Sequence, residues 1–243
     1  MSVNEKMTAI ADAIRDKTGG TEKLGLDAMA VGVGEVYEAG KQAQYDAFWD
    51  DYQENGKRTN YRYSFCGRGW TDENFKPKYT PIVLSGNVYD ISVDSKISAI
   101  DESHFDCSGA TVLQQFFTSN VSGKPATVIM NVASCTALTN GFIYSANLET
   151  VELKNIRENC TFQNTFLGCS GLVNFRCSGT IGKNISFVNS NLLSNESVQI
   201  IIGHLKDLTG QAAQTLTLHP TVGAKLTNEQ KTSVSAKNWT LVY

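Results

Sequence analysis

A Ser-His-Asp triad in this chain would have to use one of three histidines, His104, His204 or His219. His204 falls on the apolar face of an expected helix and His219 directly precedes a proline, so simpler structural roles suit both. His104 ends the sequence Asp101-Glu-Ser-His104 and has a hydroxyl and carboxylates beside it. Adjacency in sequence does not give triad geometry, however, because triads are usually assembled from distant segments.

A glycosidase would need two carboxylates at a fixed separation across a groove. The candidates are Asp94, Asp101, Glu102 and Asp106. Acidic side chains in short turns are usually only solvated, so this interpretation is weaker. Gly32-Val-Gly34 and Gly67-Arg-Gly69 lack the further glycines and the lysine of nucleotide-binding loops. We therefore predict no enzymatic activity, no catalytic residue and no cofactor.

The six cysteines, at positions 66, 107, 135, 160, 169 and 177, do not resemble a metal site. None forms a Cys-x-x-Cys pair, and no histidine lies at zinc-ligand spacing from any of them. Cys107, Cys135 and Cys169 occupy comparable positions in the repeats described below, where cysteine acts as a small buried hydrophobe. The sequence predicts free, structural thiols and no bound metal.

The composition indicates a globular protein that does not bind nucleic acid. The chain has 243 residues, 41% of them hydrophobic and 19% charged, with a net charge of -3 and a pI near 5.7. A nucleic-acid-binding protein would normally present a basic face. No apolar stretch approaches the roughly 18 residues needed to cross a bilayer, and the first residues do not form a signal peptide. We expect no membrane insertion, and a location in a virion or in the bacterial cytoplasm.

Two helices are expected before residue 55. In residues 2–17, Met7, Ile10, Ala11 and Ile14 form one apolar stripe, and paired glycines follow it. A second helical pattern spans residues 26–51, although its glycines weaken it. Such helices either pack on their own domain or pair with copies of themselves. A homo-oligomer formed through the N-terminal helices is therefore an alternative.

Residues 45–80 are dense in aromatic side chains and allow two interpretations. Tyr61, Tyr63 and Trp70 could form a stacking platform for sugar rings or a partner protein, since aromatic residues are favoured at such contacts. The favoured interpretation is a cap that covers the open end of a stack of repeats, because a terminal repeat would otherwise expose apolar core.

From about residue 88 the chain contains irregular repeats. The pattern Leu-x-x-Φ-x-Φ, in which Φ is apolar or cysteine, fits Leu148–Leu153 and Leu172–Cys177, and Leu113–Phe116 fits its first half. The leucine spacings are 24 residues from Leu148 to Leu172 and 25 from Leu113 to Leu138. Both lie within the range of leucine-rich repeats. Each pattern predicts a short strand, and the strands stack into one parallel sheet.

Alternation along these strands leaves polar side chains on the solvent face of the sheet. The candidate binding residues there are Gln115, Thr150, Glu152, Asn174 and Arg176. These side chains either bind a ligand or only solubilise the sheet. The C-terminus predicts a closing cap: a helix over 194–208, a strand over 214–218, a capping box at Thr227–Gln230 that opens a shorter helix, and a last strand over 238–243.

These patterns resemble a known group of proteins. The Phe-x-x-Cys-x-x-Leu-x-x-Φ units, such as Phe166–Phe175, resemble BspA-like leucine-rich repeats over roughly residues 88–180. The opening at Glu5–Arg15 and the ending at Lys237–Leu241 are similar to repeat proteins encoded beside tail genes in prophages of gut Gram-positive bacteria. The resemblance implies an accessory protein of a phage tail or baseplate that contacts the host surface.

The sequence as a whole predicts an α/β protein, an irregular leucine-rich-repeat solenoid with a short-strand parallel sheet. Its expected parts are an N-terminal helical segment (1–55), an aromatic-rich capping region (56–87), the solenoid (88–193) and a helix-strand cap (194–243). The expected function is non-enzymatic, either structural or in binding a protein or a cell-surface glycan. The alternatives are a BspA-like cell-surface adhesin and, third, a carbohydrate-cleaving tail protein.

Overall fold

A computed structural model describes residues 3–19, 36, 40, 43, 61–65, 71–73, 75, 81–93, 96–116 and 125–243. The chain divides into two compact units, Met1–Asn55 and Gly56–Tyr243. Each unit is described by itself below.

The first unit begins with the predicted helix, α1 (Val3–Thr18). Ala11 and Ile14 are buried while Ile10 is exposed, so only part of the expected apolar stripe is covered. Gly19 ends the helix with φ +72°, and its N–H donates to the carbonyl of Arg15 at 2.9 Å. Of the second predicted helix, only positions 36, 40 and 43 are described, and all three are helical.

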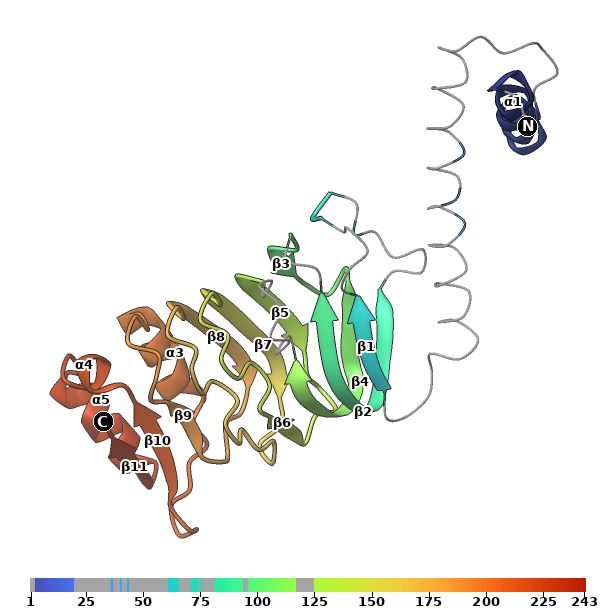
Figure 1. The fold of residues 1–243 in the computed structure, drawn as a ribbon. Helices are drawn as coiled ribbons and strands as arrows, with labels where there is room; N and C mark the ends of the chain where they lie inside the picture. Colours follow the sequence, from blue (N-terminus) through green and yellow to red (C-terminus); the bar gives the residue numbers. More distant parts are fainter. Residues whose placement is uncertain are drawn as a thin grey trace. The chain divides into compact units, whose positions relative to one another are not determined.

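The second unit is a mixed α/β structure built on parallel sheets with few helices (Figure 1). One sheet has the order β1-β2-β4-β6, comprising β1 (Tyr61–Phe65), β2 (Ile82–Val93), β4 (Phe105–Phe116) and β6 (Ala137–Thr139). The second has the order β3-β5-β7-β8, comprising β3 (Ala99–Ile100), β5 (Thr127–Asn131), β7 (Thr150–Ile156) and β8 (Asn174–Gly179). The third has the order β11-β10-β9, comprising β9 (Ile185–Phe187), β10 (Gln214–Leu218) and β11 (Trp239–Val242).

The prediction of one sheet along one face is therefore wrong. One full circuit of the chain around the body is called a coil below. After the long strands β2 and β4, each coil contains separate short strands that lie on different faces of the body. β5 is followed by β6 in one coil, and β8 by β9 in a later one. β5 pairs with β7 and β7 with β8, whereas β6 pairs with β4 and β9 with β10. Apolar alternation reports that a strand is half-buried but not which face it belongs to.

The predicted strands around the leucine repeats are present. Leu113 and Leu138, 25 residues apart, are direct partners between β4 and β6. Leu148 and Leu172 are buried just before β7 and β8. The spacing of the repeats in the sequence is thus the length of chain needed for one coil.

Stacked phenylalanines form the centre of the core. The rings of Phe142 and Phe166 lie 5.8 Å apart between centroids, and those of Phe166 and Phe187 lie 4.7 Å apart. The predicted unit Phe166–Leu172 fills the core, as expected, with Cys169 fully buried. The unit Phe187–Leu193 was missed, because Ser190 takes the place of the cysteine.

The cysteines are arranged differently from the prediction. Cys169 donates to the carbonyl of Phe142 at 3.0 Å, and Ser190 donates to the carbonyl of Cys169 at 3.1 Å, so Cys169 belongs to a column with serine. Cys135 instead hydrogen-bonds to Cys160 of the next coil, and this bond together with burial raises the pKa of Cys160. The five described cysteines are free, as predicted.

The C-terminal part closes the body with helices (Figure 1). α3 (Asn195–His204) begins at the N-cap Ser194 and packs against β8. It ends before the predicted residue 208, because Leu205 is extended and forms a bridge with Ile181. α4 (Pro220–Gly223) was not predicted, whereas the capping box opens α5 (Asn228–Ala236) as predicted. β10 pairs with β9, so this part continues the body across the predicted boundary at residues 193 and 194.

Most of the aromatic-rich stretch lies outside the described residues. Within the described part, Phe75 is buried, and its ring lies 6.2 Å from that of Phe105 at the start of β4. Phe75 is therefore part of the core beside β4, and the choice between a cap and a binding platform stays a prediction. Thr71 also forms an isolated bridge with Lys96.

Two substitutions test the strand register. Leu172→Ala should lower the free energy of unfolding by about 2 to 5 kcal/mol, because it leaves a cavity at a fully buried position. Arg176→Ala should be nearly neutral, because this side chain is exposed and its partner Glu196, 3.8 Å away, is exposed as well. Urea denaturation of both variants provides the measurement, and losses of similar size would contradict the register.

Candidate functional site

Four of the predicted binding residues lie together on the sheet β3-β5-β7-β8. Thr150 of β7 is the register partner of Asn174 of β8, and Glu152 is the partner of Arg176. The residues that alternate with them along the strands, Val151, Leu153 and Phe175, are fully buried. The predicted alternation is confirmed at these positions. Thr150, Glu152, Asn174 and Arg176, with their cross-strand neighbours in β5, are called the polar face below.

The other predicted binding residues do not belong to this face. Gln115 lies in β4, in the sheet β1-β2-β4-β6, and has a left-handed φ of 53°. The half-pattern at Leu113–Phe116 resembled the start of β7, but it forms the end of a strand that is 12 residues long. Tyr61 and Tyr63 are in β1 of that same sheet, and their side chains lie outside the described residues, as does Trp70.

Side chains of the polar face stand in rows that cross the strands. Thr127, Thr150 and Asn174 form the first row, in which the Asn174 amide donates to the Thr150 hydroxyl at 3.3 Å. The second row contains Ile129, Glu152 and Arg176. Neighbouring members of a row are about 4.8 Å apart, the spacing of hydrogen-bonded strands. A ligand lying across the coils would therefore meet one side chain per coil.

The second row ends in an exposed ion pair. The Arg176 guanidinium lies 3.8 Å from the Glu196 carboxylate in the first turn of α3. Both side chains are mostly exposed, at 60% and 74%. Because such a pair contributes little to stability, the guanidinium can exchange this partner for a ligand at little cost.

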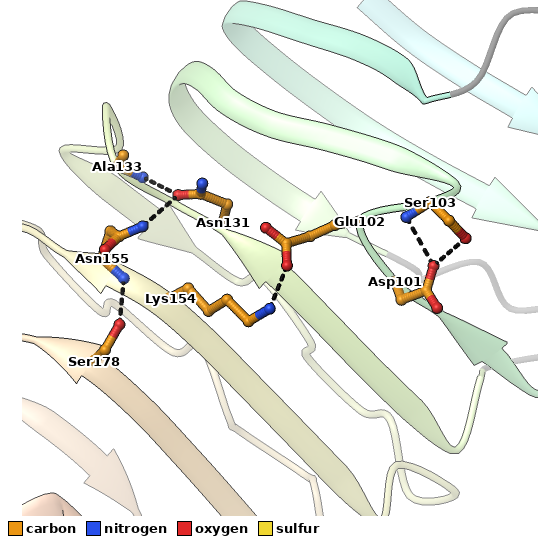
Figure 2. A network of polar contacts seen from close by, with 8 residues as sticks. All are labelled: Asp101, Glu102, Ser103, Asn131, Ala133, Lys154, Asn155 and Ser178. Carbon is orange, nitrogen blue, oxygen red and sulfur yellow. Dashed lines mark hydrogen bonds and ion pairs between the residues drawn. The ribbon is translucent and has the colours of Figure 1, made fainter.

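A network at the carboxyl ends of the strands borders the polar face (Figure 2). The Lys154 ammonium donates to Glu102, and this ion pair raises the pKa of Lys154. The side-chain oxygen of Asn131 accepts from the Asn155 amide at 3.1 Å and from the N–H of Ala133 at 3.2 Å. The N–H of Asn155 donates in turn to the Ser178 hydroxyl at 2.9 Å. The network ties three successive coils together through side chains.

The sequence analysis did not predict these network residues, although the spacing of two asparagines could have indicated them. Asn131 and Asn155 are separated by 24 residues, the same spacing as that of Leu148 and Leu172. A polar residue that recurs at the repeat spacing is expected to stack on its copy. The pairing of Glu102 with Lys154 had no comparable signal, because these residues are 52 positions apart.

The Asp101–His104 turn does not form a catalytic relay. The Ser103 hydroxyl donates to Asp101 at 2.5 Å, and Nδ1 of His104 lies 2.8 Å from the same carboxylate oxygen. Serine and histidine thus both contact the aspartate, whereas a triad needs the serine to contact the histidine. Burial alone would raise the pKa of Asp101, but the Ser103 hydrogen bonds and His104 lower it. The ring of His104 stacks on Phe75, with 5.6 Å between centroids.

The remaining histidines also have structural partners. Nδ1 of His204 lies 2.8 Å from the carbonyl oxygen of Gly179. Nδ1 of His219 accepts from the N–H of Thr221 at 3.2 Å and caps α4. Of the carboxylates considered for glycoside cleavage, Glu102 pairs with Lys154 and Asp106 accepts from the N–H of Ser108. Asp94 lies outside the described residues.

Comparison with protein-family models, with curated proteins and with solved structures gives no match for this chain. Within the described ranges, no three histidine, cysteine or acidic side chains are grouped so that they could hold a metal ion. No helix in the described part is long and apolar enough to cross a membrane. The polar face offers hydrogen-bond donors, acceptors and charges of both signs, which is a chemistry suited to binding.

Asn155 provides a test of the network. Its backbone has a left-handed φ of 61°, which asparagine and glycine tolerate better than other residues. Asn155→Ala should lower the free energy of unfolding by about 1 to 2 kcal/mol for the backbone alone, and the lost amide contact adds to this. Asn155→Gly should lose less, because it removes the amide but not the backbone compatibility. Urea denaturation should show the unchanged protein as the most stable, the glycine variant as intermediate and the alanine variant as the least stable. A glycine variant as stable as the unchanged protein would contradict a stabilising role of the amide contact, and equal stability of the two variants would contradict the effect of the left-handed backbone.

Proposed function

We propose that this chain is a non-enzymatic binding protein, whose body is an irregular leucine-rich-repeat solenoid and whose polar face contacts a protein or a cell-surface glycan. The observation behind this proposal is the alignment of Thr150, Glu152, Asn174 and Arg176 in two cross-strand rows. Their side chains are half-buried or exposed, while the alternate positions are buried. A stack of coils presents such rows as an extended surface that can take a ligand without any special catalytic residue.

The repeats support the solenoid part of the proposal. Phe142, Phe166 and Phe187 stand at corresponding places in three successive coils, and the backbone of each coil hydrogen-bonds to the next. Core positions that recur every 20 to 29 residues are typical of leucine-rich repeats. In this chain the intervals between the phenylalanines are 24 and 21 residues.

The proposed setting is a virion, in which the chain is an accessory protein of a prophage tail or baseplate that recognises the host surface. The support is the resemblance of both ends of the chain to proteins encoded beside phage tail genes. The alternative is a BspA-like adhesin of the bacterial cell surface, which the Phe-x-x-Cys-x-x-Leu units also favour. Both roles use the same polar face, and neither needs a cofactor.

The binding role predicts that the polar face can be removed without unfolding the protein. A variant with alanine at Thr150, Glu152, Asn174 and Arg176 should bind immobilised Gram-positive cell walls about tenfold or more weakly, because interface contacts concentrate in few residues. Biolayer interferometry gives the affinity, and circular dichroism checks the fold.

A matched control carries four alanines at exposed polar positions outside β5, β7 and β8. These are Gln163, Lys183, Lys225 and Ser233. The control should bind as the unchanged protein does. Equal loss in both variants, or no loss in the polar-face variant, would count against a binding role for this face.

We also propose that the N-terminal helices mediate self-association. The exposed Ile10 of α1, at 44% exposure, leaves apolar surface available for a second copy. Light scattering should show a trimer or larger species for the full chain, and a monomer for a version that begins near Tyr61. A monomer in both cases would exclude this mode of assembly.

A further inference from the structure

A shallow groove runs beside the polar face, along the amino ends of the strands. It has a volume of about 440 Å³. The lining residues are Ile97, Ser98, Ala126, Ala146, Asn147, Glu149, Gly171, Val173 and Leu192. Ser98, Ala126, Glu149 and Val173 each directly precede a strand of the sheet β3-β5-β7-β8. The groove therefore crosses four coils and differs in position from the polar face.

The backbone of the groove floor has little hydrogen-bonding capacity left for a ligand. The carbonyl of Ala126 accepts from the N–H groups of Glu149 and Thr150, at 2.8 and 2.9 Å. The carbonyl of Glu149 likewise accepts from Val173 and Asn174. A carbonyl oxygen has two lone pairs, and both are in use here. An occupant of the groove finds no free acceptor at these two carbonyls and must be recognised mainly by side chains.

Glu149 is the one charged residue among those that line the groove. Glu149 is exposed, and no described residue forms an ion pair with it. At the Ser98 end, the Asp72 carboxylate accepts from the Ser98 N–H at 2.8 Å and from its hydroxyl at 2.5 Å. These hydrogen bonds overcome the effect of burial and lower the pKa of Asp72, so it is ionised at neutral pH. Both oxygens of Asp72 are thus occupied by Ser98, and the exposed Glu149 carboxylate is the charge that favours a cationic occupant.

The opposite end of the groove is apolar. Leu192 is 55% exposed, although large aliphatic side chains are usually buried. Val173 and Gly171 also line the groove. From Ser98 to Val173 the groove crosses three strand spacings, about 14 Å, which equals the length of about four residues of extended peptide.

We propose that this groove binds an extended peptide segment of a partner protein, with a lysine or arginine at Glu149 and an apolar side chain at Leu192. The charge of Glu149 selects the basic residue. The exposed Leu192 and the length of the groove select a short segment rather than a single ion. The inference goes beyond the proposed function, because the groove can hold a peptide whether or not the polar face binds a host surface.

The test uses the full chain and a fluorescein-labelled hexapeptide, Ala-Lys-Ala-Lys-Ala-Leu, measured by fluorescence anisotropy. The lysine peptide should bind saturably, and a matched peptide with glutamate in place of both lysines should not. Glu149→Gln should weaken binding about fivefold, the effect of losing one exposed ion pair. Asn147→Trp should abolish binding, because Asn147 is exposed at the groove and the indole would fill it.

Two variants serve as controls. Glu196→Gln removes an exposed carboxylate from the border of the polar face and should leave peptide affinity unchanged. The variant with four alanines on the polar face should also bind the peptide normally, which separates this result from the test of the proposed function. Circular dichroism confirms that each variant is folded.

Several outcomes would overturn the inference. These are no saturable binding of the lysine peptide, equal binding of the glutamate peptide, or full affinity in Glu149→Gln. Displacement of the peptide by a neutral oligosaccharide, maltotetraose, that itself binds more tightly would assign the groove to a glycan instead.

Discussion

The parallel hydrogen bonding between successive coils determines the other features of this structure. Each coil donates to carbonyls of the previous coil, as Glu149 and Thr150 do to Ala126. This pairing places corresponding residues of neighbouring coils about 4.8 Å apart. Phe142, Phe166 and Phe187 consequently stack inside the body. The same constraint aligns Thr150 with Asn174 on the polar face and forms the groove at the amino ends of the strands.

Close approach of the coils also explains why certain glycines are required. A Cβ at Gly171 would lie 2.2 Å from the carbonyl oxygen of Ala146 in the preceding coil. A Cβ at Gly179 would likewise lie 2.2 Å from the carbonyl oxygen of Ile156, and Gly179 also has a left-handed φ of +89°. Gly171 lines the groove, but coil packing alone is sufficient to explain it. Glu149 and Leu192 are, by contrast, the exposed charged and the exposed large apolar residue of the groove, and for this reason they define its proposed specificity.

Many polar side chains of the body are used to close the fold. The Lys237 ammonium donates to the carbonyls of Ile202 and Leu205, both at 2.9 Å, at the end of α3. Trp239 donates through its indole to the carbonyl of Lys206 at 2.9 Å. His104, His204 and His219 likewise contact neighbouring protein groups. Arg176 and Glu149 differ from these side chains, because they are exposed and their removal should cost little stability.

The sequence by itself determined the local elements. Spacing of apolar residues predicted α1, the strands around Leu148 and Leu172, and the core unit Phe166–Leu172, while the capping box predicted α5. Alternation in β7 and β8 also predicted four residues of the polar face, because side-chain direction along a strand follows from backbone geometry. Only the tertiary structure decided which strands share a sheet. Gln115 fits the same pattern as Thr150 but belongs to another sheet, and Glu102 meets Lys154 across 52 positions. Periodicity in the sequence predicts whether a residue is buried. Which sheet Gln115 joins, and that Glu102 contacts Lys154, depend instead on where the chain turns within each coil.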